Sequence, residues 1–140
     1  MISGKLNLSV GAVGLIFAAF GGFALGMTID PFFEKGFAAV PLARFLLRGG
    51  HTHGMLISLV NVLVGLALPR LALGDAAKKA CAILTASAFL LPLGLILRGV
   101  TGGAMTFAPV AMIGGLSLVA GALLLAVGGI RSVETAKLQP

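Results

Sequence analysis

The sequence is poor in charged side chains. Of its 140 residues only 10% are charged, whereas a soluble domain carries about a quarter. In their place 59% of the residues are hydrophobic, and the mean hydropathy is +1.13. The shortage of charge argues against an ordinary soluble domain and predicts an integral membrane protein.

Three side-chain types that anchor or cross-link proteins are also scarce. Tryptophan and tyrosine are absent, so the aromatic belt that usually marks the membrane surface is missing. Cys81 is the only cysteine, which excludes an intrachain disulfide and a metal site made of cysteines alone. We interpret Cys81 as a small apolar residue inside a helix.

Long apolar runs dominate the chain instead. A bilayer core of about 30 Å requires roughly 20 apolar residues in helical form. Four runs meet this length and predict helices over about 8–28, 50–69, 76–98 and 108–131. The expected fold class is all-α: one polytopic transmembrane domain over residues 1–140, with four transmembrane helices in a bundle.

The stretch between the first two runs, about 29–49, is too polar and too interrupted to span a membrane. Pro31 and Pro41 break it, and the part from Leu42 to Leu47 predicts a short helix lying at the membrane surface. Lys5 precedes an apolar segment of full spanning length, so we expect a retained helix and not a cleaved signal peptide.

The net charge of +6 comes from basic residues that flank the apolar runs. This distribution sets orientation in a membrane and does not predict a nucleic-acid partner. Six basic residues lie on the side of both termini and four on the other, which favours cytoplasmic termini in a bacterial-type inner membrane. The six are Lys5, Arg70, Lys78, Lys79, Arg131 and Lys137, and the four are Lys35, Arg44, Arg48 and Arg98.

Small residues recur in the first and last runs. Gly22 and Gly26 are four apart, and Gly114, Gly121 and Gly128 form a seven-residue repeat. In lipid, small residues mark the faces where helices approach closely. These stripes either pack inside one bundle or form an interface of a homo-oligomer, in which a cofactor-sized pocket would form more easily between protomers.

Two histidines lie at the start of the second run, in "RGGHTHGM". On a helix turning about 100° per residue, Met55 and Ser58 lie within about 40° of His51, while His53 is nearly opposite. A regular helix therefore cannot present both histidines to one metal ion. A zinc site would need further ligands, and on that side only Asp30 and Glu34 offer carboxylates, so a zinc enzyme is a poor interpretation.

A haem requires less of the protein than a zinc ion. One neutral imidazole can bind the iron, apolar walls can hold the macrocycle, and arginines can pair with the propionates. We take His51 as the axial ligand, with His53 as the second choice. The further candidates for haem contacts are Arg44, Arg48, Arg98, Met55 and Met105. Alternatively, both histidines only cap a helix and reach the membrane surface, and this interpretation stays open.

The order of several residues resembles styrene oxide isomerase, a family of small four-helix membrane proteins. In that family the haem histidine precedes, by eighteen residues, the Leu-Pro pair that ends the second helix. The matching features are His51, Leu68-Pro69, Asp75, Lys79, Gly94 and "MTFAP" at 105–109. The resemblance implies a four-helix fold, a trimer and haem b bound through His51.

The resemblance is incomplete in the substrate pocket. Where the family has an asparagine, an aspartate and a tyrosine, this chain has Ile57, Ala88 and Ile96. The family reaction uses ferric haem as a Lewis acid to open an epoxide, and a hydride shift then gives an aldehyde (a Meinwald rearrangement). Asn61 and Ser58 are weak catalytic candidates that could replace the missing polar groups, or they are buried hydrogen-bonding residues between helices.

The expected function is that of an integral membrane haem b protein resembling styrene oxide isomerase and acting on a small apolar epoxide or a related compound. Two alternatives remain. One is a haem protein that transfers electrons or binds a small gas, and the other is an accessory membrane subunit without a cofactor.

Overall fold

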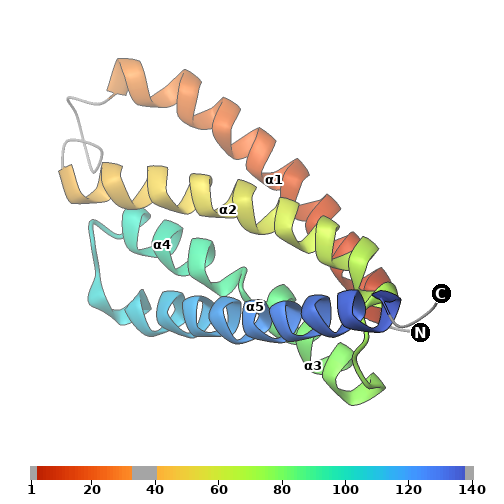
Figure 1. Cartoon of the computed structure of the whole chain (residues 1–140). Coiled ribbons are helices and arrows are strands. Elements are labelled where there is room, and N and C mark those ends of the chain that lie inside the picture. Colours follow the sequence, from red (N-terminus) through yellow and green to blue (C-terminus); the bar gives the residue numbers. More distant parts are fainter. Residues whose placement is uncertain (1–2, 33–40, 138–140) are drawn as a thin grey trace.

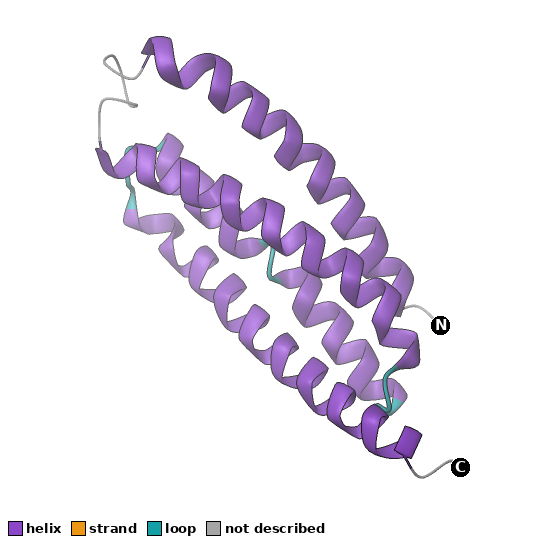
Figure 2. Cartoon of the chain, turned by 45° about the horizontal axis from the view of Figure 1, so that its top comes forward, coloured by secondary structure: helices purple, strands orange, loops and turns teal. Residues whose placement is uncertain are grey.

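A computed structural model describes residues 3–32 and 41–137 of the chain. The helices are α1 (Ser3–Phe32), α2 (Pro41–Ala67), α3 (Asp75–Ser87), α4 (Leu90–Val100) and α5 (Ala108–Lys137), with 3-10 turns η2 (Leu68–Arg70) and η3 (Met105–Phe107). Within these ranges there is no strand (Figure 2). The expectation of an all-α chain is confirmed.

Four stretches of the described chain are long and apolar enough to cross a membrane, as expected. They are Gly4–Gly26, Leu42–Arg70, Asp75–Val100 and Met105–Glu134. Successive stretches run in opposite directions, which brings both ends of the chain to the same end of the bundle (Figure 1). The helix α1 packs mainly on α2, α2 packs on α4, and both α3 and α4 pack on α5.

The helix α2 begins earlier than the sequence indicates. It starts at Pro41, so the segment 42–47 is the first part of a continuous helix and not a separate surface helix. Proline is well tolerated in a first turn, and Ala43 and Leu46 are buried against the bundle. His51 consequently lies about 15 Å along the axis from the start of α2 and not in its first turn.

The third spanning stretch is one expected helix divided in two. Pro92 has no backbone N–H, so it cannot donate to the carbonyl of Ala88 four residues earlier. That carbonyl instead accepts from the N–H of Leu91 at 3.0 Å, and the helix is interrupted at Ala88 and Phe89. The interruption separates α3 from α4 and places Phe89 at the junction.

The glycine repeat of α5 packs inside the bundle. A methyl group built on Gly121 would lie 2.7 Å from Cγ2 of Thr85, and one built on Gly128 would lie 2.8 Å from Leu73. At Gly114 the same methyl group would collide with the backbone of Leu91. Of the two interpretations of this stripe, packing within one chain is the one the structure shows.

The helix α1 is closely packed along only part of its length. Near its start, Gly4 and Gly65 bring the backbones of α1 and α2 into contact, and Gly11 lies against the carbonyl of Ser58. Farther along, no described atom lies within 4 Å of a methyl group built on Gly21. Figure 1 shows the consequence: α1 diverges from α2 toward its C-terminal end.

Candidate functional site

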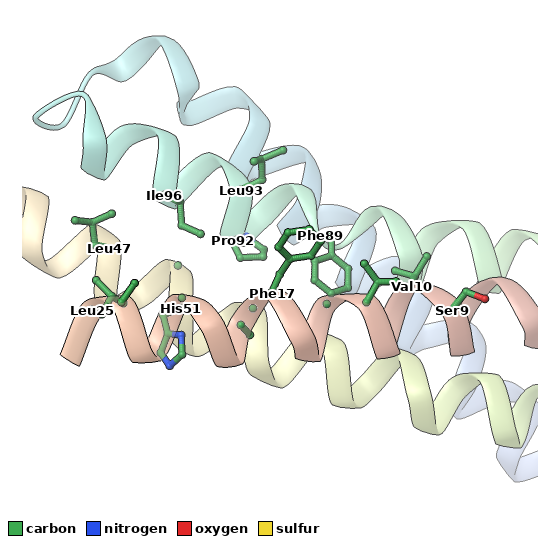
Figure 3. Close-up of a pocket in the computed structure, with 17 residues that line it drawn as sticks. Ser9, Val10, Phe17, Leu25, Leu47, His51, Phe89, Pro92, Leu93 and Ile96 are labelled. Atoms are coloured by element: carbon green, nitrogen blue, oxygen red, sulfur yellow. The ribbon is translucent and has the colours of Figure 1, made fainter. Parts of the chain in front are cut away.

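An open apolar cavity of about 780 Å³ lies between α1, α2 and the start of α4. Along α1 its wall extends from Ser9 to Leu25, and the opposite wall includes Phe89, Pro92 and Ile96 (Figure 3). Ser9 and His51 are the only polar side chains among the described residues that line it. The cavity therefore offers an apolar surface with one ionisable group near one end.

His51 projects from α2 toward α1 and is partly buried there. A methyl group on Gly22 would lie 2.7 Å from Cε1 of the imidazole and 3.1 Å from Nε2, so the glycine is what leaves room for the ring. Figure 3 shows the ring beside α1, with its nitrogens directed away from Leu93 and Ile96. His51 thus lies at the α1–α2 seam, on the margin of the cavity.

The imidazole of His51 has an unsatisfied nitrogen. Its Nδ1 is buried and has no hydrogen-bond partner among the described residues. A buried polar atom without a partner costs free energy, and an imidazole nitrogen satisfies that deficit when it binds a metal or a polar ligand. This atom is the strongest indication of a ligand in the described part of the chain.

His53 lies on another face of α2, as the helical wheel predicts. It is exposed, does not line the cavity, and its Nδ1 is 2.7 Å from the carbonyl oxygen of Gly49, to which it can donate. The bond is local, spanning one turn of α2. His53 and His51 therefore face different surroundings.

The predicted arginine and methionine contacts are not assembled around the cavity. Arg44, Arg48, Arg98 and Met55 are not among its lining residues. The Arg98 guanidinium donates to Sδ of Met105 at 3.2 Å, and its buried Nε has no partner within the described ranges. Arg98 points to η3, the turn that precedes α5, because it lies about 40° around the helix from Gly94, which packs on α5.

Asn61 and Ser58 are fully buried and lie outside the cavity wall. The Asn61 amide donates to the carbonyls of Ile57 at 3.0 Å and Thr85 at 2.9 Å. The Ser58 hydroxyl donates to the carbonyl of Gly54 at 2.6 Å. In the structure both residues are engaged in bonds within or between helices, the second of the two roles considered for them.

Asn7 is a partner that sequence reasoning missed. Its amide donates to Oδ1 of Asn61 at 2.7 Å, to Oγ1 of Thr85 at 2.8 Å and to the carbonyl of Ala82 at 3.1 Å. The two N–H groups are shared among these three acceptors. The sequence could have predicted such a bond, because an asparagine within an apolar run of a membrane helix needs a hydrogen-bond partner from another helix.

Of the three positions that match polar pocket residues of the isomerases, only one lines the cavity. Ile57 and Ala88 are fully buried and away from the cavity wall, whereas Ile96 lines it. Phe89, which sequence analysis did not single out, lines the cavity. Gly22, which sequence analysis named only as part of a small-residue stripe, leaves room for the ring of His51. Neither residue type carries a chemical signal, so only the folded chain could identify them.

A multi-residue metal centre is not formed by the described residues. No three His, Cys, Asp or Glu side chains come together within them. The side chain of Asp30 and the whole of Glu34, considered above as zinc ligands, lie outside what the structure describes.

Fold and cavity together define a class: a small all-helical protein with four stretches able to cross a membrane and an apolar cavity bordered by a histidine. Comparison with protein-family models, with curated proteins and with solved structures gives no match.

Proposed function

We propose that the chain is an integral membrane protein that binds haem b in the cavity, with His51 as the axial ligand. The observation that supports it is His51, which lines an apolar cavity of about 780 Å³ and whose buried Nδ1 has no hydrogen-bond partner among the described residues. That volume lies within the range of about 300–1,000 Å³ usual for small-molecule sites. The sequence resemblance to styrene oxide isomerase adds the haem identity.

The residues around the cavity fit a haem in two respects and fail to fit it in a third. One imidazole and apolar walls suit an iron macrocycle, but Arg98 is directed at Met105. Arg44 and Arg48 do not line the cavity, but they precede His51 by about two turns and one turn on a similar side of α2, and we propose them for the propionates. Met55 lies one turn after His51 on the same side of α2 and does not line the cavity, so it is not assigned as a second ligand.

As an enzyme, the chain would be an epoxide isomerase for a small apolar substrate. When bound, haem iron supplies a Lewis acid for an epoxide oxygen. The walls formed by Val13, Phe17 and Phe89 would hold an apolar substrate and exclude water. His51 is the only ionisable side chain that lines the cavity among the described residues. The described walls would therefore bind the substrate and exclude water, but they would not provide an acid or base besides His51.

The absorbance spectrum of the purified protein tests the haem. Expressed with added haem, the wild-type protein should show a Soret band, and so should the His53→Ala variant. The His51→Ala variant should lose the band or shift it. A wild-type protein without a Soret band would refute haem binding and favour the accessory-subunit alternative.

Turnover tests the isomerase separately. The haem-loaded protein in detergent or vesicles should convert styrene oxide to phenylacetaldehyde, followed by gas chromatography. A Soret band without aldehyde formation would refute this activity and favour electron transfer or gas binding, above all if the spectrum shows two axial ligands.

We also propose that the chain assembles as a homo-oligomer, a trimer by resemblance, in a bacterial-type inner membrane. Phe17, Phe20 and Phe23 are 67–73% exposed on one side of α1, a surface that lipid or a second copy would cover. Native mass spectrometry from detergent would show trimers, and monomers alone would refute the assembly.

A further inference from the structure

We propose that Met105 is a site of reversible oxidation and that Arg98 binds the oxygen of the resulting sulfoxide. The two residues meet at the turn between α4 and α5, at the end of the bundle away from both termini (Figure 1). Arg98 lies in the last turn of α4, and Met105 is the first residue of η3. The N–H of Gly103 donates to the carbonyl of Arg98 at 2.6 Å. This bond closes the turn and brings η3 back to the Arg98 side chain.

The edge of the Arg98 guanidinium beside Met105 has two donors and one weak acceptor. Nη2 donates to Sδ of Met105 at 3.2 Å, and a thioether sulfur accepts hydrogen bonds weakly. Nε is buried and has no partner among the described residues. Nε and Nη2 lie on one edge of the planar guanidinium, where their N–H bonds are nearly parallel and suit an oxygen acceptor. An oxygen atom at Sδ would therefore meet donors that are already in place.

The sulfur of Met105 can be reached by an oxidant dissolved in water. The side chain is 69% exposed, and the fourth spanning stretch begins at this residue, which places it at the membrane boundary. Hydrogen peroxide transfers one oxygen atom to the sulfur: an S–O bond forms, the O–O bond breaks, and the sulfur loses two electrons. The leaving hydroxide takes the proton of the transferred hydroxyl and departs as water, and the product is methionine sulfoxide.

Oxidation converts the weak acceptor into a strong one. The new oxygen is bonded to Sδ, beside Nη2, and can accept from both Nη2 and Nε of Arg98. Hydrogen bonds from a charged donor are roughly twice as strong as those between neutral groups. The sulfoxide should therefore link η3 to the end of α4 more firmly than the thioether does. It should also be reduced slowly, because a reductase must first withdraw it from Arg98.

The rate of reduction tests this binding. The full-length protein in detergent is oxidised with hydrogen peroxide and then treated with the two methionine sulfoxide reductases, one for each sulfoxide epimer. Peptide mass spectrometry follows the sulfoxide at residue 105. Its half-life should be about fivefold shorter in Arg98→Lys than in the wild type, because lysine keeps the charge but lacks the paired donors.

Thr101→Ala is the matched control for this measurement. It removes a hydroxyl that donates to the carbonyls of Leu97 and Arg98 in the same turn, but it leaves the guanidinium in place. Its sulfoxide should have the half-life of the wild type. Equal half-lives in the wild type and Arg98→Lys would overturn the proposal, and so would a Met105 that peroxide leaves unoxidised.

A glutamine at position 105 gives a second measurement that needs no oxidant. Its side-chain oxygen can accept from Arg98 as a sulfoxide would, whereas leucine has no acceptor. Met105→Gln should unfold at a higher concentration of sodium dodecyl sulfate than Met105→Leu, and adding Arg98→Leu to both should remove most of the difference. The same difference with and without Arg98 would overturn the proposal. Neither measurement involves haem, so failure here is distinguishable from failure of the proposed function.

Discussion

The imidazole of His51 lies where a side chain on α1 would otherwise be. Gly22 faces it across the α1–α2 seam, and its missing side chain is what admits the ring. Such a contact positions the histidine without a hydrogen bond and leaves Nδ1 buried and unpartnered within the described chain. The position of the proposed ligand is therefore set by packing.

Substituting the contacting glycine should disturb haem binding. In Gly22→Ala the new methyl group would lie 2.7 Å from Cε1 of His51, so the ring must move. We expect haem affinity to fall about tenfold, which corresponds to about 1.4 kcal/mol, in a titration of haem-free protein followed by absorbance. Gly26→Ala is the control, because no described atom lies within 4 Å of a methyl group built there. Equal affinities for the two variants would contradict this role of Gly22.

A second prediction for single residues concerns the hydrogen bonds of the buried asparagines. Asn7→Ala removes bonds from α1 to Asn61 and Thr85, whereas Ser58→Ala removes a bond within α2 alone. Hydrogen bonds between membrane helices contribute on average about 0.6 kcal/mol and at most about 2 kcal/mol. Unfolding by sodium dodecyl sulfate, followed by circular dichroism, should show a larger loss for Asn7→Ala, and the reverse order would contradict this account of the network.

At the scale of elements, glycine placement and Pro92 organise the bundle. The stripe that includes Gly114 lets α5 approach α4, while Pro92 interrupts the third spanning stretch and brings Phe89 to the cavity. Both devices act on backbones and not through side-chain chemistry. The glycine stripe and Pro92 therefore determine the shape of the cavity that His51 borders.

Neighbouring glycines on α5 should differ sharply in tolerance. Gly114→Ala directs a methyl group at the backbone of Leu91, whereas Gly115→Ala enters open space. Overpacking of this kind costs about 1–3 kcal/mol, measured by the same detergent unfolding. Similar stabilities for the two variants would mean that α4 and α5 do not pack through Gly114.

The positions of the helices could be predicted from the sequence more readily than the packing of one helix on another. Apolar length identified all four spanning stretches, but it could not indicate that α2 extends back to Pro41, because the residues from Leu42 to Arg48 mix basic and apolar types. Helical periodicity correctly separated His51 from His53. It could not show that Arg98 turns toward Met105, because that direction depends on which helix α4 packs against.

For the whole molecule, the ends of the bundle differ in basic charge. Arg70 and Lys78 lie at the turn between α2 and α3, at the end shared with both termini, where they donate to the carbonyls of Leu66 and Pro69. An excess of basic residues in cytoplasmic loops sets the orientation of a membrane protein. Six basic residues against four therefore favour cytoplasmic termini.

Neutralising the turn between α2 and α3 should weaken that orientation. Changing Arg70, Lys78 and Lys79 to glutamine reduces the bias from six against four to three against four. A C-terminal fluorescent reporter that matures only in the cytoplasm should be bright on the wild-type chain and dimmer on the variant at equal expression. A dark wild-type fusion would contradict the proposed topology.

The central claim, that His51 binds haem iron, is tested most directly by replacing the ligand and returning it in solution. In His51→Gly the side chain is removed, and we expect the Soret band of the haem-supplemented protein to be lost or shifted. Adding imidazole should restore a Soret band to His51→Gly, while His53→Gly should show the wild-type spectrum without any imidazole. A His51→Gly protein whose spectrum already equals that of the wild type without imidazole would contradict the claim.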